Sequence, residues 1–310
     1  MRVVIAGGTG FLGIALARAL RGDGHEVELL TRRPPEVAAR AAPGDLPGLT
    51  YVQWRPEEPG GEWAARLDGL DALVNLTGES MAARRWSAAR KVQLWESRIQ
   101  PTRALAAAVL AATRPPGLVV SASGVNYYGH RAAEVLTETA SPGTDFLAEL
   151  AEAWEREAQR MTSDRTRVAL LRTGPVLDRG GGMLKALLLP FRLGVAGPVG
   201  DGAQYVPWIQ LGDWVRLVTW ILANGHAGPF NLTAPQPVTN RDLARALGRA
   251  LGRPAFFRAP AFAMRIALGE MADAMLLASV RAVPQRALDL GFSFRYPDIH
   301  TALLASLERG

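Results

Sequence analysis

Short runs of consecutive apolar residues alternate along the chain with longer segments in which apolar positions recur every three or four residues. The short runs are typical of buried strands, and the longer period is typical of amphipathic helices. The pattern predicts strands over residues 2–6, 26–31, 50–54, 72–76, 118–122 and 168–171. Because strands that alternate with helices build a parallel sheet covered on both faces, the chain is predicted to be an α/β protein with a Rossmann-type, doubly wound parallel sheet.

A glycine-rich loop follows the first strand. Gly7, Gly10 and Gly13 form G-x-x-G-x-x-G between the strand at 2–6 and a helical pattern at 11–21. In this context the glycines allow a tight turn, close approach of the backbone to a pyrophosphate, and close packing of helix on sheet, with the helix N-terminus favouring the anion. An ordinary turn is the alternative. We expect the loop to bind a nicotinamide dinucleotide through Gly7, Gly10, Phe11, Leu12 and Gly13.

The end of the second strand indicates which nucleotide is bound. An NAD site usually carries an acidic residue there, which accepts hydrogen bonds from the ribose hydroxyls. Here the residues are Thr31, Arg32 and Arg33. Two guanidinium groups can hold a 2′-phosphate through charge-assisted hydrogen bonds, so the predicted cofactor is NADP(H). Arg32 is the preferred contact, and the alternative is that either arginine is a solvated loop residue.

After about residue 174 the alternation weakens, and helices are predicted at 183–193 and 211–223. No Ser-, Gly- or charge-rich linker separates the two parts. We therefore expect a Rossmann domain over 1–174, with later contributions near 204–232, and a smaller substrate lobe over 175–310. The helical segment between residues 86 and 112 contains Pro101, which is predicted to kink or divide it.

Composition narrows the functional classes. Of 310 residues 48% are apolar and 21% are charged, which is typical of a globular protein and excludes a disordered one. The chain has no cysteine, and its four histidines lie far apart, so we expect no metal site. Its net charge is +6, but acidic residues are interspersed among the basic ones, so we expect no nucleic-acid partner.

We expect no membrane partner either, because no apolar stretch approaches the roughly 20 residues needed to span a bilayer. Met1 leads directly into a strand, without the layout of a signal peptide, which favours a cytoplasmic protein. The expected partner is a small-molecule substrate, and the expected state is a monomer or homodimer.

Several longer motifs give the chain a family resemblance. The segments GGTGFLG, NLTGES, RRW, SRIQPTRAL, SASGVNYYG, LRTGPVL, GDGAQYVPWI and LGEMADAMLLASVRAVPQRALDLGFSFRYP occur in that order. The chain resembles the YfcH-like epimerase-family proteins, atypical extended short-chain dehydrogenases/reductases of the NAD(P)-dependent epimerase/dehydratase type. The resemblance implies a C-terminal domain of unknown function at about 248–297. It also implies that residues 121–129 face the nicotinamide and that the cofactor is lined by Asn75, Leu76, Thr77 and Gly78.

Ordinary members of the wider group use a Ser, a Tyr and a Lys four residues after that Tyr, because the Lys lowers the pKa of the Tyr. This chain has only two lysines, Lys91 and Lys185, and the residues four positions earlier are Ser87 and Gly181. The segment 146–154, where the resemblance would place the pair, contains neither a Tyr nor a Lys. The usual catalytic pair is therefore absent.

Other residues are candidates to replace it. Ser123 could hydrogen-bond a substrate carbonyl, and Tyr128 or Tyr127 could donate a proton if a cation such as Arg172 lay close. A packing role for the two tyrosines is the alternative.

The predicted substrate pocket combines residues from both parts of the chain. Arg85 could clamp an acidic or phosphorylated ligand, and a solvated helix start is the alternative. Trp208 could line the cleft or be a core aromatic. The predicted pocket residues are Glu79, Arg85, Asn126, Gln204 and Trp208.

Two functions remain open at this point. The first is an NADP(H)-dependent oxidoreductase or epimerase-like protein acting on a small polar or nucleotide-linked carbonyl or alcohol. The second is a catalytically degenerate module that binds NADPH and regulates a partner.

Overall fold

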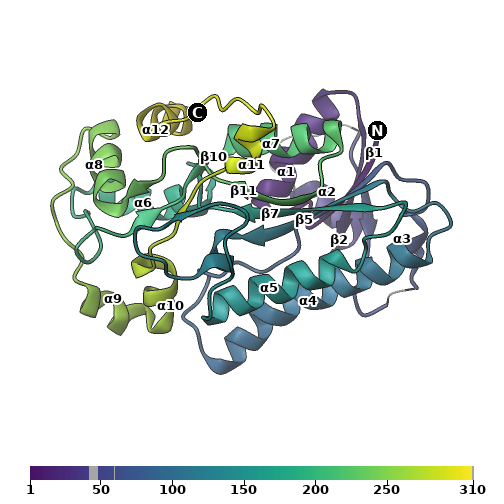
Figure 1. Ribbon diagram of the computed structural model, residues 1–310, viewed down its shortest axis with the longest axis horizontal. Coiled ribbons are helices and arrows are strands. Elements are labelled where there is room, and N and C mark those ends of the chain that lie inside the picture. Colours follow the sequence, from purple (N-terminus) through teal and green to yellow (C-terminus); the bar gives the residue numbers. More distant parts are fainter. Residues whose placement is uncertain (42–47, 59, 309–310) are drawn as a thin grey trace.

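The computed structural model describes residues 1–41, 48–58 and 60–308. A seven-stranded sheet forms its centre, with strands in the order β11-β7-β5-β4-β1-β2-β3 and every neighbouring pair parallel (Figure 1). The predicted Rossmann-type fold is confirmed. The strands are β1 (Arg2–Ala6), β2 (Glu26–Thr31), β3 (Thr50–Gln53), β4 (Ala72–Asn75), β5 (Leu118–Gly124), β7 (Arg167–Thr173) and β11 (Gly228–Leu232).

The strands are buried on both faces, as their unbroken apolar runs require. Val3 and Ile5 of β1 belong to the cluster that packs against α1 (Phe11–Gly22) and α7 (Leu211–Asn224). Val4 and Ala6 belong to the cluster that includes α4 (Ala88–Ala111) on the opposite face. Alternate side chains of one strand thus pack into two cores on opposite faces of the sheet. Figure 1 shows α4 and α5 (Phe146–Gln159) along one face of the sheet and α1 and α7 along the other.

Pro101 is predicted to kink or divide the helical segment after residue 86; the division is wrong, because α4 is a single helix. Pro101 lacks the N–H that a helix normally uses at this position. The next residue, Thr102, donates from Oγ1 to the carbonyl oxygen of Arg98 at 2.7 Å. Thr102 Oγ1 also accepts from Trp154 Nε1 of α5 at 2.9 Å, so side-chain bonds and packing hold this part of the helix.

The chain after β7 contributes both to the sheet and to a smaller lobe. α7 packs on α1 and β11 pairs with β7, so both lie with the Rossmann core. The lobe, at the left of Figure 1, contains α6 (Gly182–Arg192), α8 (Asn240–Ala250), α9 (Ala261–Leu268) and α12 (Ile299–Glu308). Its core is built around Trp208, Phe191 and Leu247.

Short strands and turns join the lobe to the sheet. The pairs are β8 (Val176–Asp178) with β10 (Ile209–Gln210), β9 (Tyr205–Val206) with β12 (Val238–Thr239), and β6 (Val135–Leu136) with β13 (Arg281–Ala282). The smaller helical elements are α2 (Pro35–Ala41), α3 (Glu62–Ala65), α10 (Glu270–Ala272), the π-helical turn η2 (Asp273–Leu277) and α11 (Gln285–Asp289). No helix in the described part of the chain has the length and apolar character needed to cross a bilayer.

Candidate functional site

A cavity of about 380 Å³ lies over the carboxyl ends of β1, β2 and β4. This is the edge of an open α/β sheet at which ligands bind, beside the point where the strand order reverses. Its walls come from the glycine loop, the end of β2, the segment after β3, the end of β4 and one side of α4. The predicted residues that line it are Gly7, Gly10, Thr31, Arg32, Leu76, Thr77, Gly78 and Glu79.

The glycines of the loop have different structural roles. Gly7 has φ +77°, and a Cβ there would lie 2.6 Å from the carbonyl oxygen of Leu76. A Cβ on Gly13 would lie 2.6 Å from the Cα of Gly8, so both positions exclude side chains because of packing. A Cβ on Gly10 would meet only the carbonyl oxygen of Gly7, at 3.3 Å. Gly10 therefore leaves space on the cavity side, at the N-terminus of α1.

Arg32 lines this cavity, whereas Arg33 is not among the lining residues. The Thr31 side chain accepts a hydrogen bond from the backbone N–H of Arg33 at 3.1 Å, which fixes the turn at the end of β2. Phe11 lies elsewhere, since its ring would be 2.5 Å from a Cβ on Gly181. Four predicted cofactor residues are thus not part of the cavity lining, namely Phe11, Leu12, Gly13 and Arg33.

Asn75 stabilises the turn after β4 that borders the cavity. It is fully buried, so the expectation that it touches the cofactor is wrong. Its Oδ1 accepts from the backbone N–H of Thr77 at 3.1 Å and from Thr77 Oγ1 at 2.7 Å. Its Nδ2 donates to Thr102 Oγ1 at 2.9 Å. Asn75 therefore holds the turn that presents residues 76–78 to the cavity.

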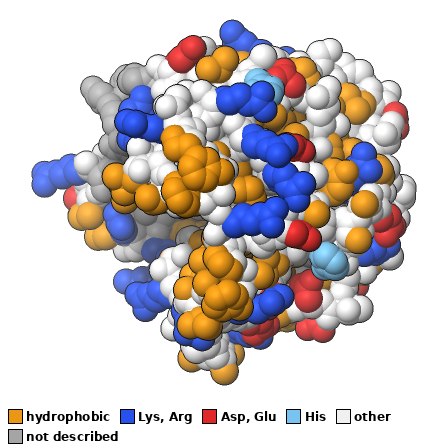
Figure 2. Space-filling view, turned by 90° about the vertical axis from the view of Figure 1, so that its left-hand side faces the viewer, with side chains coloured by type: hydrophobic (Ala, Val, Ile, Leu, Met, Phe, Trp, Pro, Cys, Tyr) orange, Lys and Arg blue, Asp and Glu red, His pale blue; other side chains and the backbone are white. Residues whose placement is uncertain are grey.

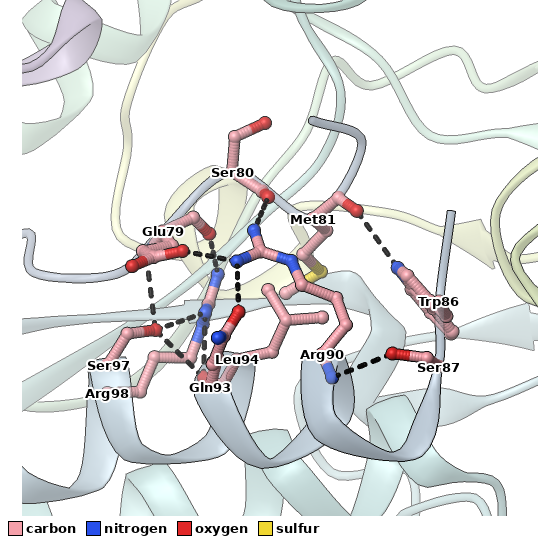
Figure 3. A network of polar contacts seen from close by, with 10 residues as sticks. All are labelled: Glu79, Ser80, Met81, Trp86, Ser87, Arg90, Gln93, Leu94, Ser97 and Arg98. Carbon is pink, nitrogen blue, oxygen red and sulfur yellow. Dashed lines mark hydrogen bonds and ion pairs between the residues drawn. The ribbon is translucent and has the colours of Figure 1, made fainter. Parts of the chain in front are cut away.

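Two buried arginines hold the next turn (Figure 3). Arg90 Nη1 donates to the Glu79 carboxylate, and Arg90 Nη2 donates to the carbonyl oxygen of Ser80 at 2.8 Å. Arg98 Nη2 donates to the carbonyl oxygen of Glu79 at 2.8 Å, and Ser97 Oγ accepts from the Glu79 N–H at 3.2 Å. The backbone and the side chain of Glu79 are thus both fixed from α4.

The charges of this cluster are strongly coupled. The hydrogen bond from Arg90 lowers the pKa of Glu79, against a smaller opposing effect of burial, and Arg32 and Arg84 lower it further. Burial lowers the pKa of Arg98 to about 10, and the neighbouring charge of Arg90 adds to this effect. The Glu79 carboxylate therefore lies among four guanidinium groups, of which only Arg32 lines the cavity.

The catalytic candidates lie in a buried polar network beyond the cavity. Ser123, at the end of β5, donates from Oγ to Glu155 Oε1 of α5 at 2.7 Å. Arg172 of β7 binds Glu155 at two points, 2.8 and 2.9 Å, and donates from Nη1 to Tyr128 OH at 3.0 Å. Tyr128 donates to Asn231 Oδ1 at 2.6 Å. The cation that the sequence suggested beside the tyrosines is therefore present.

The two tyrosines, on the short 3₁₀ helix η1 (Val125–Tyr128), differ in exposure. Tyr128 is fully buried and burial raises its pKa to about 12, so it has no surface that a ligand can touch. The expectation that Tyr128 could donate a proton to a substrate is therefore wrong, and its burial agrees with the alternative, a packing role. Tyr127 is half-buried, and the Arg172 guanidinium carbon lies 3.5 Å from its ring centroid. Burial also raises the pKa of Tyr127, while Arg172 opposes the rise.

The predicted substrate residues do not form one pocket. Trp208 is fully buried in the lobe core and donates from Nε1 to the carbonyl oxygen of Gln236 at 3.2 Å, so its expected place in a pocket is wrong. Gln204 donates from Nε2 to the carbonyl oxygens of Val199 and Leu276. Arg85 is exposed beside Gly269 of the lobe. Asn126 is half-buried on η1, and only Glu79 lines the cavity.

Sequence reasoning missed one wall of the cavity. Thr9, Leu30, Trp54, Pro56 and Glu57 also line it, as do Gln93, Glu96, Ser97, Gln100 and Pro101 of α4. The α4 residues recur at helical spacing, which is a signal that the sequence does carry. Glu155 was missed as well. Within the described residues no three potential ligands are grouped so that they could hold a metal ion.

Comparison with known proteins agrees with this geometry. Residues 3–233 match the family described as NAD dependent epimerase/dehydratase family. The chain belongs to this family. Residues 259–305 match a domain of unknown function, DUF1731, which confirms the resemblance expected for the C-terminal segment.

Relatives in this epimerase/dehydratase family extend over nearly the whole chain. The epimerase family protein SDR39U1 of Bos taurus is 39% identical over 309 residues, which are 98% of each chain. The epimerase family protein Mb2239 of Mycobacterium bovis is 41% identical over 303 residues, 97% of this chain and 96% of its own.

Two solved structures are similar to this one. Human epimerase family protein SDR39U1 (isoform 2), crystallised with NADPH, has a TM-score of 0.89, is 37% identical and matches over 100% of both chains. A chain named as the nucleoside-diphosphate sugar epimerase of Corynebacterium glutamicum has a TM-score of 0.78 and is 33% identical. The match covers 99% of this chain and 58% of that one.

Proposed function

We propose that this protein binds NADP(H) and is an oxidoreductase or epimerase-like enzyme acting on a small polar or nucleotide-linked carbonyl or alcohol. The observation that carries the proposal is that the glycine loop and Arg32 face one cavity at the carboxyl edge of the sheet. Family membership supports the general class of cofactor. The NADPH bound to the similar human protein supports the phosphorylated form.

The residues present fit this dinucleotide. Gly10 leaves room for a pyrophosphate at the N-terminus of α1, where the helix dipole favours an anion. Arg32 is exposed on the cavity wall and can bind a 2′-phosphate in a bidentate manner. No acidic residue lies at the end of β2 to accept hydrogen bonds from the hydroxyl of an unphosphorylated ribose.

For the chemical step, bound NADPH supplies a hydride. Ser123 lies at the end of β5 and donates its proton to Glu155, so its Oγ can accept a hydrogen bond from a substrate hydroxyl but cannot donate one to a carbonyl oxygen. Tyr127 is the tyrosine of η1 that retains exposed surface, and it stacks on Arg172. A tyrosine with a raised pKa is protonated at neutral pH, so it can donate a proton to an alkoxide but is a poor base. Carbonyl reduction is therefore the favoured direction.

One specific observation favours the second function, an NADPH-binding regulatory or interaction module. The Ser123 proton and both hydrogen-bonding directions of Tyr128 are already engaged inside the protein. A site whose hydroxyls serve the fold can retain the nucleotide without turning it over.

Two measurements separate these functions. Titration with NADPH, followed by its fluorescence, tests binding alone. A screen of nucleotide sugars and simple carbonyls for NADPH oxidation then tests turnover. Binding with turnover of any substrate supports the enzyme, and tight binding without turnover replaces it by the module. If NADPH does not bind, both functions are excluded.

A further inference from the structure

The helix α9 is unusual because none of its residues is buried, although it consists mainly of apolar residues. Phe262 and Ile266 lie one turn apart on it, and 66% and 70% of their surfaces are exposed. Large apolar side chains in a globular protein normally face a core. A helix that exposes both of them on one side needs a partner to cover that side.

Two neighbouring segments add to this apolar surface. Leu189 and Leu193, near the end of α6, are each 67% exposed. Phe256 and Phe257 are exposed in the loop before α9, with ring centroids 4.5 Å apart. We define the lobe face by its exposed apolar residues, which are Leu189, Leu193, Val195, Phe256, Phe257, Phe262 and Ile266.

Backbone contacts place these segments together. Residues 193–200 run beside residues 254–259, because Val199 forms a bridge with Ala259 and the Ala259 N–H donates to the carbonyl oxygen of Pro198 at 3.0 Å. A Cβ on Gly197 would lie 2.7 Å from the carbonyl oxygen of Phe257. The end of α6, this pair of segments and the start of α9 therefore lie next to one another, since a Cβ on Gly200 would lie 3.8 Å from the Cβ of Ala261.

The charged residues beside the lobe face are mostly basic. Residues 243–269 contain no acidic residue, and residues 184–200 contain none either. The basic side chains in these two segments are Lys185, Arg192, Arg245, Arg249, Arg253, Arg258 and Arg265. Arg245 forms an ion pair with Asp242, and Arg265 forms one with Asp273. Figure 2 shows hydrophobic side chains gathered beside a column of Lys and Arg side chains at this end of the molecule.

We propose that the lobe face binds the surface of an anionic lipid bilayer. Apolar side chains that protrude from a helix, a loop and a helix end can each enter the headgroup region without a complementary groove. Arginines whose guanidinium groups have no carboxylate partner can bind lipid phosphates. Arg253 and Arg258 flank the exposed Phe256 and Phe257 in sequence and have no ion-pair partner among the described residues. The absence of a spanning helix does not bear on such a surface contact.

A second copy of this chain fits the lobe face less well. A two-fold contact would bring the same basic surface of both copies together, and like charges at short range repel. The bilayer instead supplies the opposite charge. The proposal departs from the expectation that the protein has no membrane partner, and it does not depend on the proposed enzymatic function, because the nucleotide cavity lies over the sheet and contains no lobe-face residue.

Co-sedimentation with vesicles tests the proposal. The probes are vesicles of phosphatidylcholine alone and vesicles of phosphatidylcholine with phosphatidylserine, at low salt and at about 0.5 M salt, where charge attraction is screened to a few ångström. We expect binding to the mixed vesicles at low salt and much weaker binding to phosphatidylcholine alone. High salt should release most of the protein.

Four variants locate the contact. Phe256→Ser with Phe262→Ser removes apolar contacts, and Arg253→Glu with Arg258→Glu inverts charge. The matched controls are Leu110→Ser, an exposed leucine of α4, and Arg66→Glu, an exposed arginine after α3. Loss of the positive charge of Arg253 or of Arg258 should weaken vesicle binding about fivefold. NADPH titration and circular dichroism verify that each variant is folded.

Absence of wild-type binding to mixed vesicles would overturn the proposal, and so would lobe-face variants that bind as strongly as the controls. Light scattering tests the remaining alternative, that a second copy of this chain covers the lobe face. If the wild type is a dimer that the lobe-face variants dissociate, a second copy covers this surface and the bilayer proposal is wrong.

Discussion

Ser123 and Glu155 are joined by a hydrogen bond of 2.7 Å between the end of β5 and the middle of α5. By resemblance, α5 is the helix that carries the Tyr and Lys of ordinary members of the wider group. Here it supplies a carboxylate, which is neutralised by Arg172 from β7. The position beside Ser123 is therefore occupied by a buried ion pair instead of a free cation.

Loss of this carboxylate should destabilise the protein. In Glu155→Gln the buried Arg172 keeps its charge without a counter-ion, and such a loss costs about 3–5 kcal/mol. Urea unfolding measures it. The control is Glu152→Gln on the same helix, whose ion pair with Arg156 is exposed and should contribute at most about 1 kcal/mol. Equal losses in the two variants would contradict a structural role for the buried pair.

The two tyrosines of η1 should have separate effects on catalysis. With any substrate found in the screen, Tyr127→Phe should lower kcat at least about a hundredfold, the usual contribution of a proton donor. Tyr128→Phe should leave kcat almost unchanged and lower the free energy of unfolding by about 1–2 kcal/mol. The reverse pattern, with kcat lost in Tyr128→Phe and kept in Tyr127→Phe, would refute this assignment.

Tyr128 should also make the protein sensitive to alkali. In the unfolded chain a tyrosine loses its proton near its ordinary pKa of 10, whereas burial raises the pKa of Tyr128 to about 12. Below pH 10 both states are protonated, and above it only the unfolded state releases the proton, so the free energy of unfolding falls by about 2 kcal/mol as the pH rises toward 12. Tyr128→Phe should lack this part of the fall. Parallel curves for both proteins between pH 9 and pH 12 would contradict it.

Glycine substitutions should separate binding from folding. Gly10 has φ −80°, and a Cβ there would meet one atom, the carbonyl oxygen of Gly7 at 3.3 Å, so Gly10→Val should fold at a cost of about 1 kcal/mol. Its side chain would occupy the cavity and lower NADPH affinity at least about 100-fold. Gly7→Ala should unfold more readily, because φ is +77° and the Cβ would clash with Leu76. Normal NADPH binding by folded Gly10→Val would place the nucleotide elsewhere.

Local sequence patterns predict most strands of the central sheet and part of the cavity lining. The apolar runs predict six strands of the central sheet, and the glycine loop and Arg32 follow directly from residues adjacent to strands. The prediction missed β11, a short edge strand that begins Gly-Pro and lies far along the chain. Local pattern does not show which distant segment completes a sheet.

The buried polar network around Ser123 and Arg172 shows the same limit of prediction from local sequence. Glu155 reads as one charge on an amphipathic helix, and only the packing of α5 against β5 and β7 reveals that it faces Ser123 and Arg172. Tyr128 and Trp208 are large residues with polar groups. The sequence placed Tyr128 among the catalytic candidates and Trp208 in the substrate pocket. The structure buries both, because their polar atoms find partners inside the protein. The identity of a residue sets its possible chemistry, and packing decides whether a ligand can reach it.

The central claim is that the cavity binds NADP(H) through the glycine loop and Arg32. Its most direct test is titration of the wild type with NADPH and NADH at one ionic strength, beside Arg32→Ala and the control Arg33→Ala. A charge-assisted contact of about 1.5–3 kcal/mol predicts roughly 10- to 150-fold tighter binding of NADPH by the wild type and by Arg33→Ala, and near-equal binding of both nucleotides by Arg32→Ala. Equal affinities of the wild type for NADPH and NADH would contradict the claim.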